Sequence, residues 1–283
     1  MMKQDFSAKK ELKLSARMLA LADLVIPGCR LADVGCDHGY IPIYLCRTEK
    51  IPSAIAMDIN RGPLERAGKH IAECGLSDRI ETRLSDGLEQ LRGDEADAVL
   101  IAGMGGCLMC RILTAHSGVP ESVTELILQP QSDIDRVRRC IRDIGFSITD
   151  EDMVEEDGKF YPMIKAGRAA ACGVSNTAAA ERTCGPSERS CGPAEWLAGK
   201  NRYDETEESP EWAEICNAFG PVLLAKRHPV LKRWLEKELV TADRILKRLE
   251  EEPAVHEKRN LSERYQEILR KRRMIVSALS CYS

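Results

Sequence analysis

The stretch LADVGCDHGYIP, residues 31–42, places acidic side chains and two glycines where a strand is expected to turn into a helix. Its first residues are mostly apolar and predict the strand, and the apolar residues after Gly39 predict an amphipathic helix. Gly35 and Gly39 allow the backbone to bend and to approach a ligand closely. This arrangement predicts a turn that holds a nucleotide cofactor.

The composition of the turn separates two classes of cofactor. A dinucleotide loop would read G-x-G-x-x-G, and this chain has Asp37 where the second glycine would stand. A carboxylate there would repel a pyrophosphate, but it would not repel S-adenosylmethionine, which carries a sulfonium and an ammonium cation and no phosphate. Asp33, at the end of the strand, is likewise suited to the cationic amino-acid end of that cofactor. The turn therefore favours S-adenosylmethionine over NAD.

Further acidic residues follow at the ends of later apolar runs. Asp58 ends SAIAMD and stands 25 positions after Asp33, close to the offset of about 20 at which a carboxylate binds a ribose diol in such folds. Asp86 can accept a hydrogen bond from an adenine amino group, and Gly87 leaves room for the ring. The expected cofactor-binding residues are Asp33, Gly35, Asp37, Tyr40, Asp58, Ile59, Asp86, Gly87, Ala102 and Gly103.

The elements that must position these residues alternate between strand and helix from about residue 30 to residue 166. This alternation predicts an α/β fold with a doubly wound, mostly parallel sheet. Helices are predicted at residues 7–26, 39–48, 63–73, 106–115 and 132–144. A nearly apolar run at 96–102 ends in the sequence GMGG, which predicts a loop at the carboxyl edge of the sheet, where such folds bind ligands.

Two further strand patterns, at residues 146–153 and 160–166, flank a charged turn, EEDG, at residues 155–158. Such a turn suits an antiparallel hairpin. A sheet finished by a hairpin is the arrangement of Rossmann-like class I methyltransferases and not of dehydrogenases. The pattern thus supports methyl transfer.

The rest of the chain divides into two parts of different composition. Residues 167–209 are rich in Ala, Gly, Cys and Ser with little periodicity, which predicts a loosely ordered, protease-sensitive insertion. From residue 226 onward, apolar residues recur at steps of three and four, stop at Glu251-Glu252-Pro253 and then resume, which predicts an antiparallel two-helix coiled coil. The predicted domains are a catalytic domain at 1–166, the insertion at 167–209 and a basic helical hairpin at 210–283.

Charge separates the hairpin from the body of the protein. Residues 226–273 contain 15 Lys or Arg and 9 Asp or Glu, so this segment carries about +6 and the remainder of the chain about −10. A basic arm on an acidic domain is the electrostatic pattern of an RNA-binding protein, although an ordinary solvated helix can carry the same charges. The expected phosphate contacts are Lys226, Arg227, Arg270, Lys271, Arg272 and Arg273.

Composition also limits the compartment and the metal chemistry. No apolar stretch reaches the length of about 18 residues needed for a membrane span, and the first residues lack the apolar core of a signal peptide. The 12 cysteines are scattered through a large chain, which favours reduced thiols in a cytoplasmic protein. Cys107 and Cys110 form the only C-x-x-C, without a second ligand pair at zinc spacing, so no metal is expected.

Taken together, these motifs resemble the bacterial tRNA (adenine-22-N1)-methyltransferase family. The resemblance runs through LKLSARMLALADLV, DVGCDHGYIPIYL, AMDINRGPLERA, SDGLE, IAGMGG, LILQP, VEEDGKFY and GPVLLAKRHPVLKRWLEKEL. The chain departs from the family at Gln131, where Asn is usual, and at Pro162, where Glu is usual. Gln131 is therefore given no specific role, and Lys159 and Tyr161 are weaker site candidates. The resemblance implies an enzyme that uses S-adenosylmethionine and has tRNA as its partner. A monomer is expected.

The implied chemistry makes modest demands on the protein. Adenine N1 has an in-plane lone pair, so it can attack the sulfonium methyl group in line without a strong general base, and positioning and electrostatics should supply most of the catalysis. The base must be unpaired or flipped, because N1 lies on its Watson–Crick edge. The backbone of residues 102–106 is expected to hold the base, and Asp37 or His38 to orient it or to stabilise the developing charge. The expected catalytic residues are Asp37, His38, Gly103, Met104, Gly105 and Gly106.

Two other readings remain open from the sequence. A methyltransferase acting on a small molecule or a protein would share the cofactor turn, but it would not need the basic hairpin. A non-catalytic RNA-binding protein could retain the cofactor fold, although the acids at 33, 58 and 86 are all present.

Overall fold

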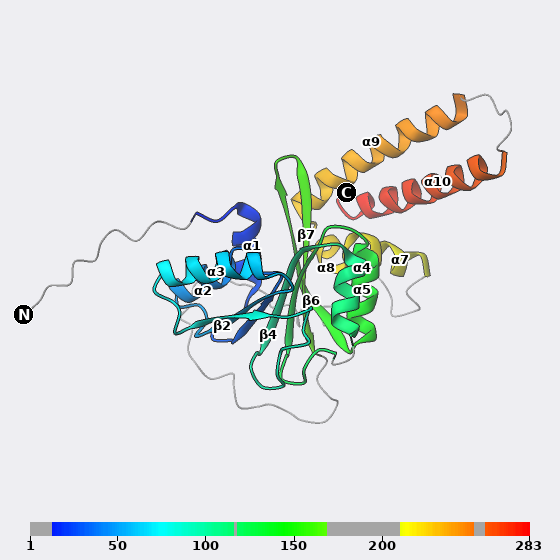
Figure 1. Ribbon diagram of the computed structural model, residues 1–283. Coiled ribbons are helices and arrows are strands. Elements are labelled where there is room, and N and C mark those ends of the chain that lie inside the picture. Colours follow the sequence, from blue (N-terminus) through cyan, green and yellow to red (C-terminus); the bar gives the residue numbers. More distant parts are fainter. Residues whose placement is uncertain (1–12, 116–117, 169–209, 252–257) are drawn as a thin grey trace, which may run out of the picture.

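The computed structural model describes residues 13–115, 118–168, 210–251 and 258–283 (Figure 1). Within them lies a seven-stranded sheet of order β3-β2-β1-β4-β5-β7-β6. The first five strands in this order are parallel, and β7 runs antiparallel to both of its neighbours. The strands are β1 (Leu31–Val34), β2 (Ala54–Asp58), β3 (Ile80–Leu84), β4 (Ala98–Met104), β5 (Glu125–Pro130), β6 (Phe146–Glu156) and β7 (Lys159–Arg168). The predicted doubly wound sheet with a final hairpin is confirmed.

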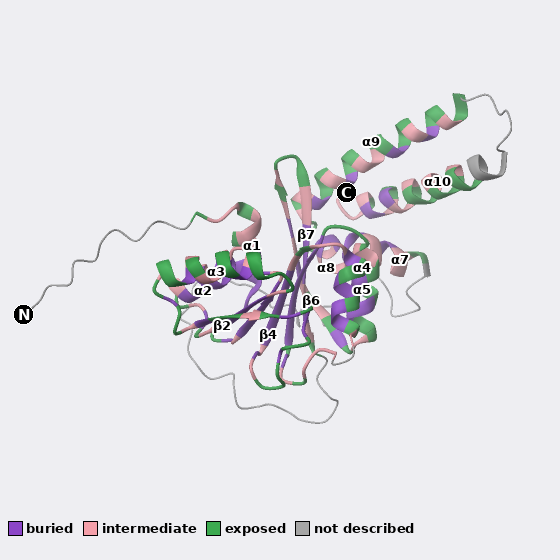
Figure 2. Ribbon diagram, viewed as in Figure 1, coloured by how far each residue is buried: buried purple, intermediate pink, exposed green. Residues whose placement is uncertain are grey.

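Helices cover both faces of the sheet. The inner strand β1 is buried throughout, as expected for a parallel strand covered on both faces. Side chains of α1 (Ala16–Leu24), α2 (Tyr40–Arg47) and α3 (Arg61–Glu73) form one apolar core with the sheet, and those of α4 (Gly106–Thr114) and α5 (Ile134–Asp143) form a second core on the opposite face (Figure 2). At the carboxyl edge of the sheet, where the strands pass into helices, Asp37, Ile59 and Gly103 are exposed.

The C-terminal part adds a third apolar core. It comprises α7 (Pro210–Phe219), α8 (Pro221–Ala225), α9 (Pro229–Glu251) and α10 (Lys258–Ser280), and it meets the sheet at Met153 of β6. The helices α9 and α10 lie side by side and project away from the sheet (Figure 1). Tyr265 of α10 donates a hydrogen bond to Glu250 of α9 at 3.0 Å. The predicted helical hairpin is present, and its coiled-coil geometry stays a prediction.

Three predicted boundaries are wrong in detail. The sequence GMGG is not a loop, because β4 continues through Met104 and Gly106 already begins α4, which leaves Gly105 alone between them. The EEDG turn is shorter than predicted: β6 includes Glu156, and only Asp157 (φ 50°) and Gly158 (φ 73°) reverse the chain. The predicted helix 7–26 begins at Ala16 within the described residues.

The predicted insertion falls almost entirely outside the described residues. Positions 167 and 168 belong to β7, because they continue the hydrogen-bonded ladder of the hairpin. The remaining positions, 169–209, are not described, so their predicted protease sensitivity and the domain boundaries stay predictions.

Candidate active site

The turn between β1 and α2 is held against β2. The amide groups of Gly35 and Cys36 both donate hydrogen bonds to the carbonyl of Met57, at 2.8 and 3.1 Å. Gly35 has a φ of +75°, and a Cβ there would lie 2.3 Å from the Met104 methyl group. Gly39 is also left-handed and forms the N-cap of α2. Both glycines therefore have a left-handed backbone conformation, which would be strained for any other residue.

Asp33 lies beneath this turn and is 5% exposed. Burial, together with the nearby charge of Asp58, raises its pKa to about 7. None of the described residues donates a hydrogen bond to the Asp33 carboxylate. A buried acid without a partner fits a cationic ligand group, which would restore the ionised form.

The expected ribose and adenine residues end the next two strands. Asp58 accepts a hydrogen bond from the amide of Asn60 at 2.8 Å, and the Ile59 side chain is 58% exposed, so an apolar face is available beside the acid. After β3, the Ser85 hydroxyl donates to the carbonyl of Gly87 at 2.9 Å, while Asp86 is exposed. The structure thus brings both strand ends to the carboxyl edge, on the side of β1 away from β4.

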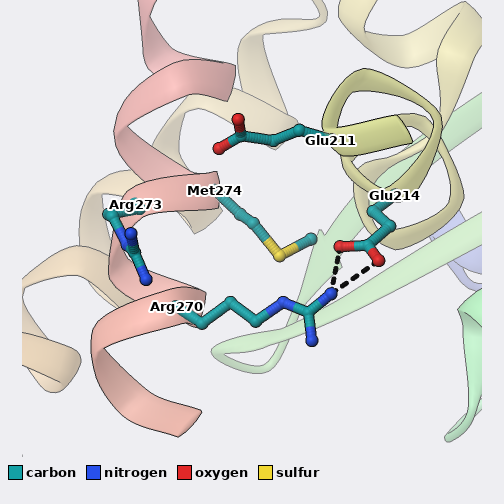
Figure 3. Close-up of a pocket in the computed structure, with 5 residues that line it drawn as sticks. All are labelled: Glu211, Glu214, Arg270, Arg273 and Met274. Carbon is teal, nitrogen blue, oxygen red and sulfur yellow. Dashed lines mark hydrogen bonds and ion pairs between the residues drawn. The ribbon is translucent and has the colours of Figure 1, made fainter. Parts of the chain in front are cut away.

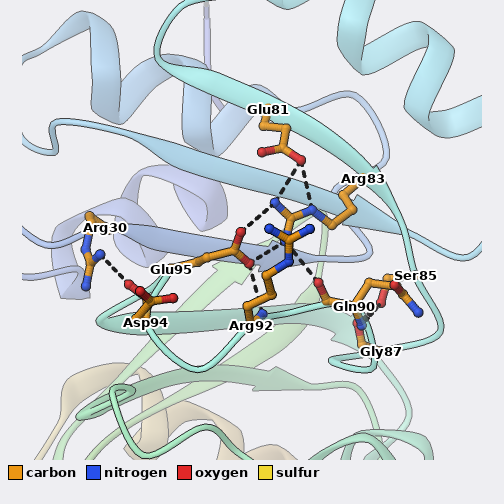
Figure 4. A network of polar contacts seen from close by, with 9 residues as sticks. All are labelled: Arg30, Glu81, Arg83, Ser85, Gly87, Gln90, Arg92, Asp94 and Glu95. Atoms are coloured by element: carbon orange, nitrogen blue, oxygen red, sulfur yellow. Dashed lines mark hydrogen bonds and ion pairs between the residues drawn. The ribbon is translucent and has the colours of Figure 1, made fainter.

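A network of charged side chains braces the turn that carries Asp86 (Figure 4). Arg83 donates to Glu95 at 2.5 and 3.0 Å and to the carbonyl of Gln90 at 2.9 Å. The hydrogen bonds from Arg83 lower the pKa of Glu95 to about 2. This network fixes the loop between β3 and β4 and makes no contact with the expected catalytic residues.

Asp37 and His38, predicted to be catalytic, are both engaged on the side of α3. Asp37 is exposed, with a φ of 47°, and accepts a hydrogen bond from Arg66 at 3.1 Å. The His38 ring stacks on the rings of Tyr40 and His70, with centroids 5.2 and 5.5 Å apart. Their catalytic roles stay predictions, and the ring stack gives Tyr40 a structural role.

The end of β4 is tied to the end of β5. The amide of Gly103 donates to the side-chain oxygen of Gln129 at 3.2 Å, and the amide of Gln131 donates to the carbonyl of Met104 at 2.8 Å. A Cβ on Gly106 would lie 2.4 Å from the carbonyl oxygen of Ser132. The glycines of IAGMGG therefore allow two strand ends to approach closely at the edge.

Four residues that the sequence did not select, or ranked low, meet beside Gly103. They are Arg17 of α1, Gln129 of β5, Glu156 of β6 and Tyr161 of β7. Gln129 is a fully buried amide at the end of an otherwise apolar strand, LILQP, and this was a signal that could have identified it. Arg17 and Glu156 gave no such signal, because charged residues are common on exposed helices and turns.

The predicted RNA-binding residues differ in their surroundings. Most are ion-paired within the protein: Lys226 with Asp150, Arg270 with Glu214, Lys271 with Glu238 and Arg272 with Asp243. In contrast, Arg227 and Arg273 are exposed and form no ion pair with another described residue. Arg270 and Arg273 line an open groove between α7 and α10 (Figure 3). Their role in RNA binding stays a prediction.

The described residues contain neither a cluster of metal-ligating side chains nor a membrane-spanning helix. No group of three or more His, Cys, Asp or Glu side chains among them could hold a metal ion. None of their helices is long and apolar enough to cross a membrane. Of the predicted C-x-x-C pair, Cys107 is exposed and Cys110 is buried, while the cysteines at 172, 184 and 191 lie outside the described part of the chain.

The sheet order, the glycine turn and the acidic strand ends at its carboxyl edge define a class I methyltransferase, and the family model described as "Methyltransferase domain" matches residues 14–164. A tRNA (adenine(22)-N(1))-methyltransferase from Bacillus subtilis is 39% identical over 156 residues, which are 55% of this chain and 66% of that protein, just under two thirds. The structure also matches that of a candidate tRNA (m1A22) methyltransferase from Streptococcus pneumoniae, with 30% identity and a TM-score of 0.72 over 94% of this chain and 100% of that one. The chain belongs to this tRNA methyltransferase family.

A second structure of the streptococcal protein holds S-adenosyl-L-methionine. It has 29% identity and a TM-score of 0.70, covering 94% of this chain and all of that one. The similarity therefore includes the C-terminal helices as well as the sheet.

Proposed function

We propose that this protein methylates N1 of adenine 22 in tRNA, with S-adenosylmethionine as the methyl donor. The observation that carries the proposal is the buried Asp33 beneath a glycine turn, in a chain that belongs to the tRNA methyltransferase family. A buried carboxyl group that receives no hydrogen bond from the described residues suits a cationic cofactor and is unsuited to a pyrophosphate.

Residues of the carboxyl edge would hold this cofactor. Asp33 and the backbone of the Gly35 turn would bind its amino-acid end, Asp58 its ribose hydroxyls, and the turn at Asp86 and Gly87 its adenine. When bound, S-adenosylmethionine supplies an electrophilic methyl group. Tyr40, Ile59, Asp37 and Ala102 are proposed as further contacts.

The protein then has to hold the adenine in place and exclude water. Adenine N1 is unprotonated at neutral pH, so no residue has to remove a proton before it attacks. Gly103, held by the buried Gln129, offers a fixed backbone edge against which the base can be positioned. Met104, Gly105 and Gly106 complete this edge, while Asp37 and His38 are proposed to stabilise the developing positive charge.

The C-terminal arm, which consists of helices α7–α10 (residues 210–251 and 258–283), is proposed to bind the tRNA backbone. Arg227 and Arg273 are the primary candidates because both are exposed and unpaired among the described residues. Lys226, Arg270, Lys271 and Arg272 would have to exchange their internal carboxylate partners for phosphates. We further propose that the protein acts in the cytoplasm as a monomer.

The direct test is methyl transfer from labelled S-adenosylmethionine to unmodified bacterial tRNA, with the modified nucleoside and its position identified by mass spectrometry. The expected product is N1-methyladenosine at position 22, and the same tRNA with guanosine at that position is the matched control. Methylation at another position would overturn the proposed site but not the enzyme class. Transfer to small molecules alone, or cofactor binding without any transfer, would support the alternative classes.

A further inference from the structure

Arg17 occupies a position at the catalytic edge that the cofactor residues do not explain. Its guanidinium carbon lies 5.0 Å from the ring centroid of Tyr161, and its Nη1 donates a hydrogen bond to the side-chain oxygen of Gln129 at 3.1 Å. A Cβ built on Gly103 would lie 3.8 Å from the same Nη1. A planar cation and an aromatic ring therefore lie together next to the end of β4.

Gln129 fixes the position of this guanidinium relative to Gly103. Its side-chain oxygen accepts hydrogen bonds from both Arg17 and the Gly103 amide, and its amino group donates to the carbonyl of Pro130 at 3.1 Å. The side chain is 0% exposed. Because its hydrogen bonds determine which way the amide points, Gln129 connects Arg17 rigidly to the strand end.

Glu156 holds Arg17 from the opposite side. The backbone amide of Arg17 donates to Glu156 Oε1 at 3.3 Å, and the guanidinium Nε lies 3.9 Å from Oε2. That Nε is buried and forms no hydrogen bond with any described residue. Arg17 is thus held between Gln129 and Glu156, while its side chain stays 23% exposed.

The hairpin places this cluster just past the carboxyl end of β5. Leu128 of β5 pairs with Ile164 of β7, so Tyr161 and the hairpin tip extend past the carboxyl end of β5. Arg17 and Tyr161 are each only partly buried. The cluster therefore forms one wall of the open edge, next to the glycines expected to receive the base.

We propose that Arg17 and Tyr161 form the subsite that receives the flipped adenine, by stacking on its ring and donating a hydrogen bond to it, and that Gln129 and Glu156 are positioning residues. The inference rests on the proposed function. It assigns roles to residues that lie within the motifs LKLSARMLALADLV, LILQP and VEEDGKFY but were not selected from the sequence or, like Tyr161, were only weaker candidates. Unstacked bases bind preferentially to aromatic rings and to guanidinium planes. A base removed from its stack needs such a surface to offset the lost stacking.

The test compares variants in full-length protein under single-turnover conditions, with tRNA and cofactor saturating. Arg17→Ala and Tyr161→Leu are expected to slow methyl transfer at least about tenfold, whereas cofactor affinity, measured by calorimetry, should change less than about twofold. Tyr161→Phe keeps the ring and should retain most of the rate. Arg139→Ala is the matched control, because Arg139 is an exposed arginine of α5 on the opposite face of the sheet.

A second readout separates stacking from structural damage. A tRNA carrying 2-aminopurine at the target position reports by its fluorescence whether the base leaves its stack and enters a new one. Arg17→Lys keeps the charge near Glu156 but lacks the planar fork, so it should unfold at the wild-type temperature and still lose the bound-state fluorescence change. Retention of both the rate and the fluorescence change in the Arg17 variants would overturn the inference.

The design distinguishes failure of this inference from failure of the proposed function. Wild-type transfer to adenine 22 together with unaffected Arg17 and Tyr161 variants would overturn the subsite alone. Absence of transfer to tRNA by the wild-type protein would overturn both. A loss of rate with an equal loss of cofactor affinity would also contradict the subsite, because it would assign the two residues to the cofactor instead.

Discussion

At the scale of single residues, the carboxyl edge of the sheet combines the buried Asp33 with glycines in the left-handed backbone region, Gly35, Gly39 and Gly103, where other residues would be strained. The pKa of Asp33 is raised to about 7 because burial penalises its charged form and because the charge of Asp58 repels it. Cation binding should weaken at low pH, because the protonated Asp33 attracts an ammonium group far less strongly than the ionised form does. The pKa of this one carboxyl should therefore appear in the pH dependence of cofactor binding.

We expect affinity for S-adenosylmethionine to rise as the pH increases from 5.5 to about 7. The ordinary pKa of 3.8 is raised to about 7 in the folded protein, so within this window the folded chain holds a proton that the unfolded chain has lost. The stability of the free protein should accordingly fall as pH rises through the window, while cofactor affinity gains up to about tenfold per pH unit. Calorimetric titration measures the affinity. Asp33→Asn should bind weakly and show no such slope, and a flat wild-type profile would contradict the assignment.

Gly106 provides a steric test of the contact between β4 and β5. Gly106→Ala would place a methyl group 2.4 Å from the backbone oxygen of Ser132 and 2.8 Å from that of Asp133, and a backbone atom cannot move aside as a flexible side chain can. We expect a loss of about 1–3 kcal/mol in unfolding free energy and a marked loss of methyl transfer. Gly93→Ala is the matched control, because no atom lies within 4 Å of its added Cβ. Equal effects of the two substitutions in urea unfolding would refute this account.

At the scale of elements, the β6–β7 hairpin joins the carboxyl edge of the sheet to the C-terminal arm. Successive side chains of a strand point to opposite faces. Glu156 and Tyr161 therefore point toward Arg17, whereas Glu155 lies on the other face and pairs with Arg233 of α9 at 3.0 Å. The Lys237 ammonium lies 5.2 Å from the ring of Phe160 and donates to the carbonyl of Gly158. One hairpin thus carries the arm on one side and contacts the candidate base subsite on the other.

A buried ion pair between α5 and β6 attaches the C-terminal arm to the sheet. Arg138 of α5 donates to Glu151 of β6 at 2.8 Å, with the two side chains 1% and 0% exposed. Arg138 also donates to the carbonyls of Asn217 and Ala218, and Glu151 accepts from the amide of Val222 at the start of α8. The pair therefore satisfies backbone groups at the junction of α7 and α8.

We expect Arg138→Ala to lower the unfolding free energy by about 3–5 kcal/mol, because it leaves the Glu151 charge buried and unpaired. The neighbouring Arg139 is exposed and pairs with Asp135 on its own helix, so Arg139→Ala should change stability by no more than about 0.5 kcal/mol. Urea unfolding of the two variants tests the difference. Equal and small losses would show that the arm is held by its apolar contacts instead.

At the scale of the whole molecule, internal pairing reduces the basic character of the arm. The segment 226–273 carries about +6 by sequence, but carboxylates of the protein neutralise several of its cations in the structure. Paired and unpaired cations lie side by side in the groove between α7 and α10 (Figure 3). Arg270 pairs with Glu214 at 2.5 Å, and Arg273 forms no ion pair with another described residue.

Because Arg270 is ion-paired and Arg273 is not, we expect the two arginines to contribute unequally to the salt dependence of tRNA binding. If Arg273 binds a tRNA phosphate, Arg273→Ala should reduce the slope of log affinity against log salt by about 1. Arg270→Ala should reduce it by less, because forming a phosphate contact there first requires breaking the Glu214 pair. Filter binding of tRNA over a range of salt concentrations measures both slopes. A larger effect at Arg270 would contradict the pairing seen in the free protein.

The sequence by itself determined the strand ends, the glycine turn and the helical stripes of this protein. These features depend on local rules, since periodicity decides which face is buried and a glycine marks a bend wherever it occurs. Asp33, Asp58 and the glycines of IAGMGG could be selected for this reason, although the extent of the GMGG segment could not. The strand that contains Gly103 is extended by its pairing with β5.

Only the tertiary structure decided which distant residues complete the site. Arg17 and Gln129 are 112 positions apart, and Arg17 and Glu156 are 139 apart; they meet because the order of strands in the sheet brings β5, β6 and β7 beside α1. The pairing of the arm's cations depends in the same way on where the hairpin and the helices dock. Local sequence patterns carry no information about such contacts, because a charged residue on a helix has the same pattern whether its partner is water, a carboxylate or a nucleic acid.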